Sequence, residues 1–390
     1  MQSLRDAKCG FYFETAGRQD RYGKYRRGAA ASEYDPQIVR YEDFAAELDA
    51  PEGWMFGVVG YDAKNIVEPV LSTTRPSLYR APVVSFFRPT RMCVETGKYA
   101  SVESSGPVPE LPTFEPLISR SEYDGAVERL MEHIRRGDVY EINYTFPFAA
   151  HAPAGFDALD YYERRAAPVP FSCLYFDGER TMICFSPERF LQKHGRRLIT
   201  EPIKGTAARS HDSKLDRRIR RGLKRGAKFR AENTMIVDLS RNDLHRVCVP
   251  QSVRVERWCE IRTFSTLHHS VSTIVGEIEA DKTNSQAFAA AFPPGSMTGA
   301  PKVRAMQLID QNEAYARGWY SGAAGYVDEH GNFDFNVVIR SLLLVGDKMF
   351  FHVGGALTID SDASAEYEEC LAKAASFAKL GARAYFQIQG

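Results

Sequence analysis

The sequence predicts an α+β protein in which large antiparallel sheets dominate. Apolar segments recur in pairs around short turn signals, and each pair is typical of a β-hairpin. The turns of three such pairs are Asp177-Gly178, His330-Gly331 and Gly346-Asp347. Only a few helical patterns interrupt these pairs, so we do not expect the regular strand and helix alternation of a parallel sheet. Of the 390 residues, 44% are hydrophobic, which is sufficient for a large core.

The first 115 residues mix short apolar runs, such as 54–61 and 82–87, with polar stretches. This mixture is expected of strands joined by long loops. Three prolines then fall within 107–112 and break regular structure. We therefore expect a boundary near residue 115, with a smaller part at 1–115 and a larger part at 116–390.

Helical patterns follow in the larger part. Ser121 has an acid three residues later, which is typical of a helix start, and apolar residues at helical spacing continue to a stop at Gly137. A second apolar helical stretch carries Glu232 near its start. The last predicted helix places Glu366 and Glu369 three residues apart and so on one face.

The charges balance over the chain, with 50 Lys and Arg residues against 50 Asp and Glu residues. A protein that coats nucleic acid or an anionic membrane usually has an excess of basic residues, so we expect neither partner. Residues 214–230 are the local exception, because they hold nine basic residues and one acid, Asp216. A solvated face, a docking surface for an acidic partner and a nucleic-acid surface all remain open for this segment, although no platform of aromatic residues is interleaved with its charges.

The seven cysteines are scattered and show no CxxC spacing, which favours reduced thiols over a disulfide framework or a zinc site. The amino-terminal residues lack the apolar core of a signal peptide, and no run of 18 apolar residues occurs. We therefore expect a cytoplasmic protein.

Lys204 and Glu188 are the first candidates for chemistry. Lys204 follows the predicted hairpin turn at His194-Gly195, which would place it at the end of a strand. A lysine held neutral by desolvation can act as a nucleophile, whereas an ordinary lysine is a surface residue. Glu188 lies one hairpin upstream, so the two side chains could face each other on neighbouring strands as acid and nucleophile.

Two further features could bind ions. Glu232, Glu366 and Glu369 offer only oxygen ligands, which suit Mg²⁺, although an acidic first turn can also serve the helix dipole alone. Residues 292–302 form a small-residue loop that enters a helix at Pro301, and its amides could bind an anion or simply make a turn. The loop lacks the Gly-Lys-Ser/Thr ending of a nucleotide-binding loop.

Together these segments resemble the chorismate-utilising enzymes, a group that includes anthranilate synthase component I, aminodeoxychorismate synthase component I, isochorismate synthase and salicylate synthase. The resembling motifs run in order through residues 116–385: GDVYEINYTF (137–146), SPERF (186–190), EPIKGTAAR (201–209), RAENTMIVDLSRNDL (230–244), HSVS (269–272), PPGSMTGAPK (293–302), YSGAAGY (320–326), VIR (338–340), HVGGALT (352–358) and EYEECLAKA (366–374). The resemblance implies an α+β fold of two large antiparallel sheets packed around a substrate cleft with flanking helices. It also implies an anthranilate-synthase-component-I-like subdomain at 1–115 and a chorismate-binding catalytic domain at 116–390.

The lysine in PIKGT makes the chain most similar to aminodeoxychorismate synthase component I, because anthranilate synthases typically carry alanine there. The implied reaction converts chorismate and ammonia to 4-amino-4-deoxychorismate, for 4-aminobenzoate and folate synthesis. Lys204 would add at C2, Glu188 would protonate the departing C4 hydroxyl, and ammonia would open the intermediate at C4. Anthranilate synthase component I is the alternative, and a non-catalytic binding protein that uses residues 214–230 is an alternative of another class.

The resemblance also assigns the other site residues. The catalytic set is Lys204, Glu188 and His269, and a purely structural role for His269 stays open. The predicted substrate-binding residues are Thr206, Gly299, Tyr320, Gly322, Arg340, Gly354, Gly355 and Lys373. The predicted Mg²⁺ ligands are Glu232, Glu366 and Glu369.

Some positions depart from the family pattern. Glu141 stands where ammonia-using relatives usually have Gln and water-using relatives have Lys, so water chemistry is disfavoured and the orientation of ammonia is open. Phe229 stands where many relatives have a polar or acidic residue, which leaves fewer metal ligands on that helix. Residues 11–15 only faintly resemble the tryptophan pocket of feedback-inhibited relatives, so we predict no tight tryptophan regulation. Because the motifs leave little room for a glutaminase, we expect a glutamine amidotransferase partner to supply ammonia.

Overall fold

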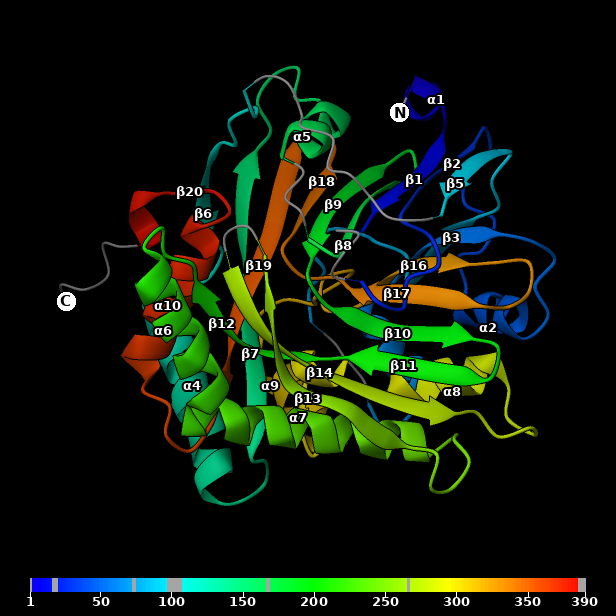
Figure 1. Cartoon of the computed structure of the whole chain (residues 1–390). Coiled ribbons are helices and arrows are strands. Elements are labelled where there is room, and N and C mark those ends of the chain that lie inside the picture. The colour runs from blue at the N-terminus through cyan, green and yellow to red at the C-terminus, as the bar shows by residue number, and fades with distance from the viewer. Residues whose placement is uncertain are drawn as a thin grey trace.

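The computed structural model describes residues 2–15, 20–71, 75–96, 107–165, 169–264 and 267–384. Within these ranges two sheets, of 11 and 9 strands, form the centre of the molecule, and helices lie around them (Figure 1). All strand pairs except β6 with β20 are antiparallel. The predicted α+β class with two large antiparallel sheets is therefore confirmed.

The first sheet contains, in spatial order, β20 (Lys379–Leu380), β6 (Thr113–Pro116), β7 (Glu141–His151), β19 (Lys348–Leu357), β18 (Ser341–Val345), β9 (Arg180–Ser186), β8 (Phe171–Phe176), β1 (Cys9–Glu14), β2 (Arg27–Ser32) and β5 (Arg91–Glu95), with β15 (Gly299–Ala300) paired to β7. The second sheet contains β12 (Ile203–Ala208), β14 (Leu267–Glu277), β11 (Arg197–Glu201), β10 (Arg189–His194), β17 (Phe333–Val337), β16 (Ala323–Val327), β3 (Met55–Val59) and β4 (Val84–Phe87), with β13 (Arg254–Thr263) paired to β14.

The helices are α1 (Gln2–Arg5), α2 (Tyr41–Asp49), α3 (Lys64–Val67), α4 (Arg120–Arg135), α5 (Ala158–Arg165), α6 (Ser213–Arg225), α7 (Ala227–His245), α8 (Asn284–Ala291), α9 (Lys302–Asn312) and α10 (Ala363–Ala375). Short 3₁₀ turns cover Tyr61–Ala63, Gly295–Met297 and Ala382–Ala384. The predicted helix after the boundary is α4, but Ser119 caps it through the backbone amide of Glu122, so the predicted start at Ser121 was wrong. Ser119 and Glu122 satisfy each other's backbone amides, which fixes the true first turn.

The three predicted hairpins are confirmed. They are β8 with β9, β16 with β17, and β18 with β19. In each case glycine at the turn has a positive φ, at Gly178, Gly331 and Gly346. Such a backbone conformation strains most other residues, so the turn position and the register are fixed by the local sequence.

Three hydrophobic clusters define the layers. One packs α4, α9 and α10 against the first sheet, and another packs α2, α7 and α8 against the second. The third lies between the sheets and includes Phe11 and Tyr175 from the first sheet with Phe56 from the second. The molecule is thus built as helices, sheet, sheet and helices, and each sheet is buried on both faces over much of its area.

Strands from residues 1–115 belong to both sheets. β1 pairs with β8 in the first sheet, and β3 pairs with β16 in the second. Both sheets therefore continue across the predicted boundary at residue 115, and the division into 1–115 and 116–390 stays a prediction from the sequence. Residues 104–106 of the proline-rich stretch lie outside the described residues.

Candidate functional site

Lys204 is the second residue of β12, directly after the bend at Pro202. The expected position at the end of a strand was wrong, because Pro202 interrupts the ladder and β12 begins beyond it. Asn233 of α7 donates a side-chain hydrogen bond of 2.7 Å to the carbonyl oxygen of Lys204. This contact fixes the backbone from which the lysine side chain extends.

The Lys204 ammonium forms an ion pair and a hydrogen bond with Oε1 of Glu141, at the start of β7. Both side chains are largely buried, with 11% of Lys204 and 2% of Glu141 exposed. Burial alone would lower the pKa of Lys204, but Glu141, and then Glu232 and Glu188, raise it above its ordinary value. In the substrate-free protein Lys204 is therefore a protonated amine.

Glu188 lies in the connection between β9 and β10 and is 4% exposed. The predicted placement of Glu188 and Lys204 on neighbouring strands was wrong, because β11 and β14 separate β10 from β12. Glu188 and Lys204 still influence each other electrostatically. Arg189 of β10 pairs with Glu201 of β11, and this register brings Glu188 opposite Pro202, two residues before Lys204.

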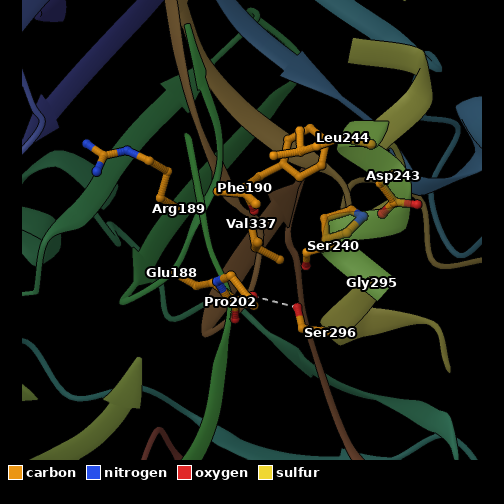
Figure 2. Close-up of a pocket in the computed structure, with 13 residues that line it drawn as sticks. Glu188, Arg189, Phe190, Pro202, Ser240, Asp243, Leu244, Gly295, Ser296 and Val337 are labelled. Atoms are coloured by element: carbon orange, nitrogen blue, oxygen red, sulfur yellow. Dashed lines mark hydrogen bonds between the residues drawn. The ribbon is translucent and has the colours of Figure 1, made fainter. Parts of the chain in front are cut away.

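The Glu188 carboxyl lines a pocket between the β11–β12 bend, α7 and the 3₁₀ turn at Gly295–Met297 (Figure 2). Its Oε1 accepts a hydrogen bond of 2.6 Å from the Ser296 hydroxyl. Burial raises the pKa of Glu188 to about 7, although Ser296 and Lys204 act in the opposite direction. A carboxyl with this pKa can hold a proton near neutral pH, as a general acid requires.

The neighbouring Arg189 anchors this segment. Its guanidinium is fully buried and binds Glu201 at 2.5 Å, Asp334 at 2.9 Å and Asp20 at 2.8 Å. A buried guanidinium whose nitrogen atoms all donate hydrogen bonds to carboxylates is held in a fixed geometry. We infer that Arg189 fixes the backbone that carries Glu188.

Thr206 and His269 face each other across β12 and β14. The Thr206 hydroxyl and Nδ1 of His269 are 2.8 Å apart. Burial, followed by Arg340 and His268, lowers the pKa of His269 to about 3, so the ring is neutral. Its Nε2 is buried and has no hydrogen-bond partner among the described residues, so this atom is free to meet a substrate group.

Arg340 adopts a left-handed backbone conformation, with φ of 50°, directly before β18. It acts electrostatically on both Glu188 and His269, so it belongs to the same group of side chains. Tyr320 is buried and stacks on His352, with the ring centroids 4.9 Å apart. The positive φ of Arg340 is uncommon for a residue other than glycine, and such a backbone conformation often marks a functional position.

The carboxylates of α10 form a second group. Glu366 is 7% exposed and accepts a hydrogen bond of 2.8 Å from Ser361, whereas Glu369 is exposed and pairs with Lys373 at 2.8 Å. Lys373 also donates to the carbonyl oxygen of Gly354 at 2.9 Å. Its ammonium therefore ties α10 to β19.

Four predicted substrate-binding glycines have different surroundings. A Cβ at Gly299, Gly322 or Gly354 would lie between 2.2 and 2.4 Å from a backbone oxygen of a neighbouring strand, so close backbone packing by itself requires glycine there. At Gly355 a Cβ would meet Oε2 of Glu366 at 3.2 Å. Glycine at 355 therefore keeps the space in front of this carboxylate clear.

Strand β7 connects the two groups. Glu141 begins β7, and Gly354 and Gly355 lie opposite Thr145 and Tyr144 on its neighbour β19. A separation of three or four residues corresponds to about 10–13 Å along a strand. Hydrogen bonds and electrostatic influence link Lys204, Glu188, Thr206, His269 and Arg340 to one another. The contacts described above for Glu366, Glu369 and Lys373 are with Ser361, with Gly354 and with each other.

The described residues contain no group of three or more His, Cys, Asp or Glu side chains arranged to hold a metal ion. A cage made wholly of protein ligands is therefore not present among them. The carboxylates do fit Mg²⁺ in another way, because this ion keeps several waters and binds through one or two carboxylates together with substrate oxygens. The clear space beside Glu366 suits such a shared site, and Glu232, which acts on the pKa of Lys204, lies with the first group.

The small-residue loop at 292–302 is built into the core. Gly299 and Ala300 pair with β7, and α9 begins at Lys302, directly after Pro301. The Lys302 ammonium is buried and binds Asp243 at 2.6 Å. The loop's main contact with the site is the Ser296 hydroxyl, and anion binding by its amides stays a prediction.

The basic segment forms α6 and the start of α7. Asp216 anchors α6 through Arg209 and through His268 at 3.0 Å, and the Arg209 hydrogen bond chiefly lowers the pKa of Asp216 to about 2. Most of the basic side chains of α6 are exposed. The side chain of Phe229 lies outside the described residues.

Sequence reasoning missed three contacts of the site. Glu141 was noted only as a departure from the family pattern, and Ser296 only as part of a loop. Asn233 was not singled out, although it stands next to Glu232. The signal that could have found them is their position within motifs that already contain candidate residues.

The chain matches a known enzyme family over most of its length. Residues 9–379 match the family model described as chorismate binding enzyme. A probable chloroplastic aminodeoxychorismate synthase from Oryza sativa is 41% identical over 67% of this chain and 30% of that protein. Anthranilate synthase component 1 from Haloferax volcanii is 40% identical over 66% of this chain and 50% of that protein. The chain thus spans 30% to 50% of the length of these curated relatives.

Solved structures share the fold. Anthranilate synthase component I from Streptococcus pneumoniae superposes with a TM-score of 0.75 at 24% identity, covering 94% of this chain and 89% of that chain. Across the part of the chain that the structure describes, no helix has the length and apolar character needed to cross a membrane.

Proposed function

Because the chain belongs to the chorismate-binding enzyme family, we propose that it forms 4-amino-4-deoxychorismate from chorismate and ammonia, as aminodeoxychorismate synthase component I does. The observation that carries this proposal is the buried Lys204 amine, held between Glu141 and the influence of Glu188. The product would serve the synthesis of 4-aminobenzoate and folate.

Lys204 supplies the nucleophile in this reaction. Its amine adds at C2 of chorismate while the C4 hydroxyl departs, which gives a covalent intermediate. Ammonia then adds at C4 and the bond between C2 and Lys204 breaks. The lysine thus divides one difficult displacement into two steps and directs the new amino group to C4.

Glu188 supplies the proton for the departing hydroxyl. Its pKa of about 7 leaves a large fraction of the carboxyl protonated near neutral pH, and the Ser296 hydrogen bond orients it. We assign His269 the role of hydrogen bonding to the ring substituents, because its ring is neutral and its Nε2 has no hydrogen-bond partner among the described residues.

Positive charge and polar donors orient the two carboxylates of chorismate. We assign this role to Arg340 and Tyr320, with Thr206 and Lys373 at the edges of the site and with the amides near Gly299, Gly322, Gly354 and Gly355. Mg²⁺, when bound, neutralises the ring carboxylate. Glu366, Glu369 and Glu232 would hold it through carboxylate oxygens shared with water and substrate.

Ammonia needs a source, and we propose a glutamine amidotransferase partner. The name "component 1" of the Haloferax relative is consistent with a second component. We also propose the cytoplasm as the compartment.

Anthranilate formation is the second candidate. It is favoured by one observation, since the Haloferax anthranilate synthase component is nearly as similar to this chain as the rice protein is. In that reaction ammonia itself adds at C2 and Lys204 has no covalent role. A binding protein that uses the exposed basic face of α6 is a candidate of another class, and it would show no turnover.

Product analysis decides between these functions. Purified protein is incubated with chorismate, Mg²⁺ and ammonium, and the products are identified by mass. We expect aminodeoxychorismate from the wild type and none from Lys204→Ala. Full activity of Lys204→Ala would refute the covalent route, and anthranilate with pyruvate would identify the second candidate.

A further inference from the structure

We propose that Glu141 accepts the proton of the Lys204 ammonium before the amine attacks and holds that proton until the amine is released. This role rests on the proposed function and adds a catalytic residue to it. The observation behind it is the direct contact between the two side chains, which join β7 of one sheet to β12 of the other.

Lys204 cannot attack while it is an ammonium, because its nitrogen then has no free electron pair. Three carboxyl groups act on it, namely Glu141 from β7, Glu188 from the segment before β10, and Glu232 from α7. All three favour the charged amine. The structure therefore needs a way to remove the proton at the moment of reaction.

Glu141 is placed for this transfer, because its carboxylate contacts the Lys204 ammonium directly. Its Oε1 already receives the N–H of Lys204, whereas Glu188 faces Ser296 and must give its own proton to the departing hydroxyl. Glu232 raises the pKa of Lys204 through its charge, with a smaller effect than Glu141. Proton transfer needs a donor and acceptor within hydrogen-bond reach, and Glu141 meets this condition.

The contact between Glu141 and Lys204 is shielded from water, because both side chains are largely buried. Oε2 of Glu141 is buried and has no hydrogen-bond partner among the described residues, and its Oε1 accepts the hydrogen bond of the Lys204 ammonium. Moving the proton removes two buried charges together, which lowers the desolvation penalty on both side chains. The ladder of β7 with β19 and β15 holds the carboxylate in place meanwhile.

The protons and electrons balance through the cycle. An N–H bond of Lys204 breaks and an O–H bond forms on Glu141, and the freed electron pair of Nζ bonds to C2. The C4–O bond breaks and the hydroxyl leaves as water with the proton of Glu188. Ammonia bonds to C4, the C2–N bond returns its electrons to Nζ, the surplus proton at C4 goes to Glu188, and Glu141 returns its proton to Lys204.

The first test measures Lys204 without the reaction. Cyanate carbamylates neutral amines, and the extent at Lys204 is followed by peptide mass across pH in the absence of chorismate and metal. We expect the midpoint pH for carbamylation of Lys204 to fall by about one unit or more in Glu141→Gln. At a fixed pH below both midpoints, this shift means about tenfold more carbamylation in the variant than in the wild type. Glu141→Asp should stay near the wild type, and Glu132→Gln, an exposed carboxylate that pairs with Arg136 on α4, is the matched control.

The second test measures turnover with chorismate, Mg²⁺ and ammonium. At about pH 7.5 we expect Glu141→Gln to lose about 10²-fold or more in kcat and to recover with rising pH along its own carbamylation curve. The wild type should be active at pH values far below the midpoint pH for carbamylation of its Lys204. The Glu141→Asp variant should keep part of the wild-type activity.

The two experiments separate the possible failures. An unmoved carbamylation curve, or wild-type turnover in Glu141→Gln at about pH 7.5, overturns the role of Glu141 while the proposed function stands. A wild type that forms no aminodeoxychorismate overturns the proposed function and this proton transfer together.

Discussion

Replacing Glu188 by Gln tests the link between burial and catalysis most directly. Gln has the same shape and can still accept the Ser296 hydrogen bond, but it cannot hold or release a proton. Burial raises the pKa of Glu188 from 4.5 to about 7, so the wild-type carboxyl is about nine-tenths protonated at pH 6 and about one-tenth protonated at pH 8. We therefore expect wild-type turnover to fall about tenfold between these pH values.

The same shift predicts a change in stability with pH. The folded protein keeps the proton up to about pH 7, whereas the unfolded chain releases it near pH 4.5. The contribution of Glu188 is thus fully present below pH 4.5 and is lost as pH rises through about 7. Over this interval, at about 1.4 kcal/mol per pH unit, the loss amounts to about 3 kcal/mol in the free energy of unfolding.

Two measurements check this prediction. Urea unfolding of the wild type and Glu188→Gln should give similar stabilities near pH 4.5, and the variant should be about 3 kcal/mol more stable near pH 8. Turnover of the variant should fall by about 10²–10⁴-fold and lose the change with pH around 7. The reasoning is refuted if the stability difference between the two proteins stays constant with pH, or if wild-type turnover is flat through pH 7.

Four other predictions follow from the structure. Ser296→Ala removes a hydrogen bond that lowers the pKa of Glu188, so the midpoint of the pH–rate profile should move up by about one unit, and an unchanged midpoint would exclude this contact as a tuning element. Chelation of divalent ions should abolish turnover and Mg²⁺ should restore it. Glu366→Gln should raise the Mg²⁺ concentration for half-maximal rate more than Glu369→Gln does, because Glu366 is buried and oriented whereas Glu369 is exposed and paired; equal effects would contradict this ranking. Tryptophan should leave the rate unchanged up to about 1 mM, because the ring of Phe13 packs into the aromatic cluster beside β16; inhibition in steady-state assays at lower concentrations would disprove it.

The sequence by itself determined the local structure and the family. Turns such as Gly178 and Gly346 fix hairpins because two-residue loops with glycine at positive φ allow few alternatives. Helix positions follow from apolar spacing for the same local reason, although the cap of α4 fell at Ser119 and not at Ser121. The order of the motifs was sufficient to predict two antiparallel sheets and the candidate residues.

Only the tertiary structure decided how those residues meet. Glu141 lies 63 residues before Lys204 and on the other sheet, and Ser296 lies 108 residues after Glu188. No local rule links such distant positions, because their contact depends on how the sheets pack. The protonation states follow from the same packing, since burial of Glu188 and the carboxylate beside Lys204 set their pKa values. The sequence therefore supplied the chemical groups, and the packing of the two sheets decided which of them lie in contact.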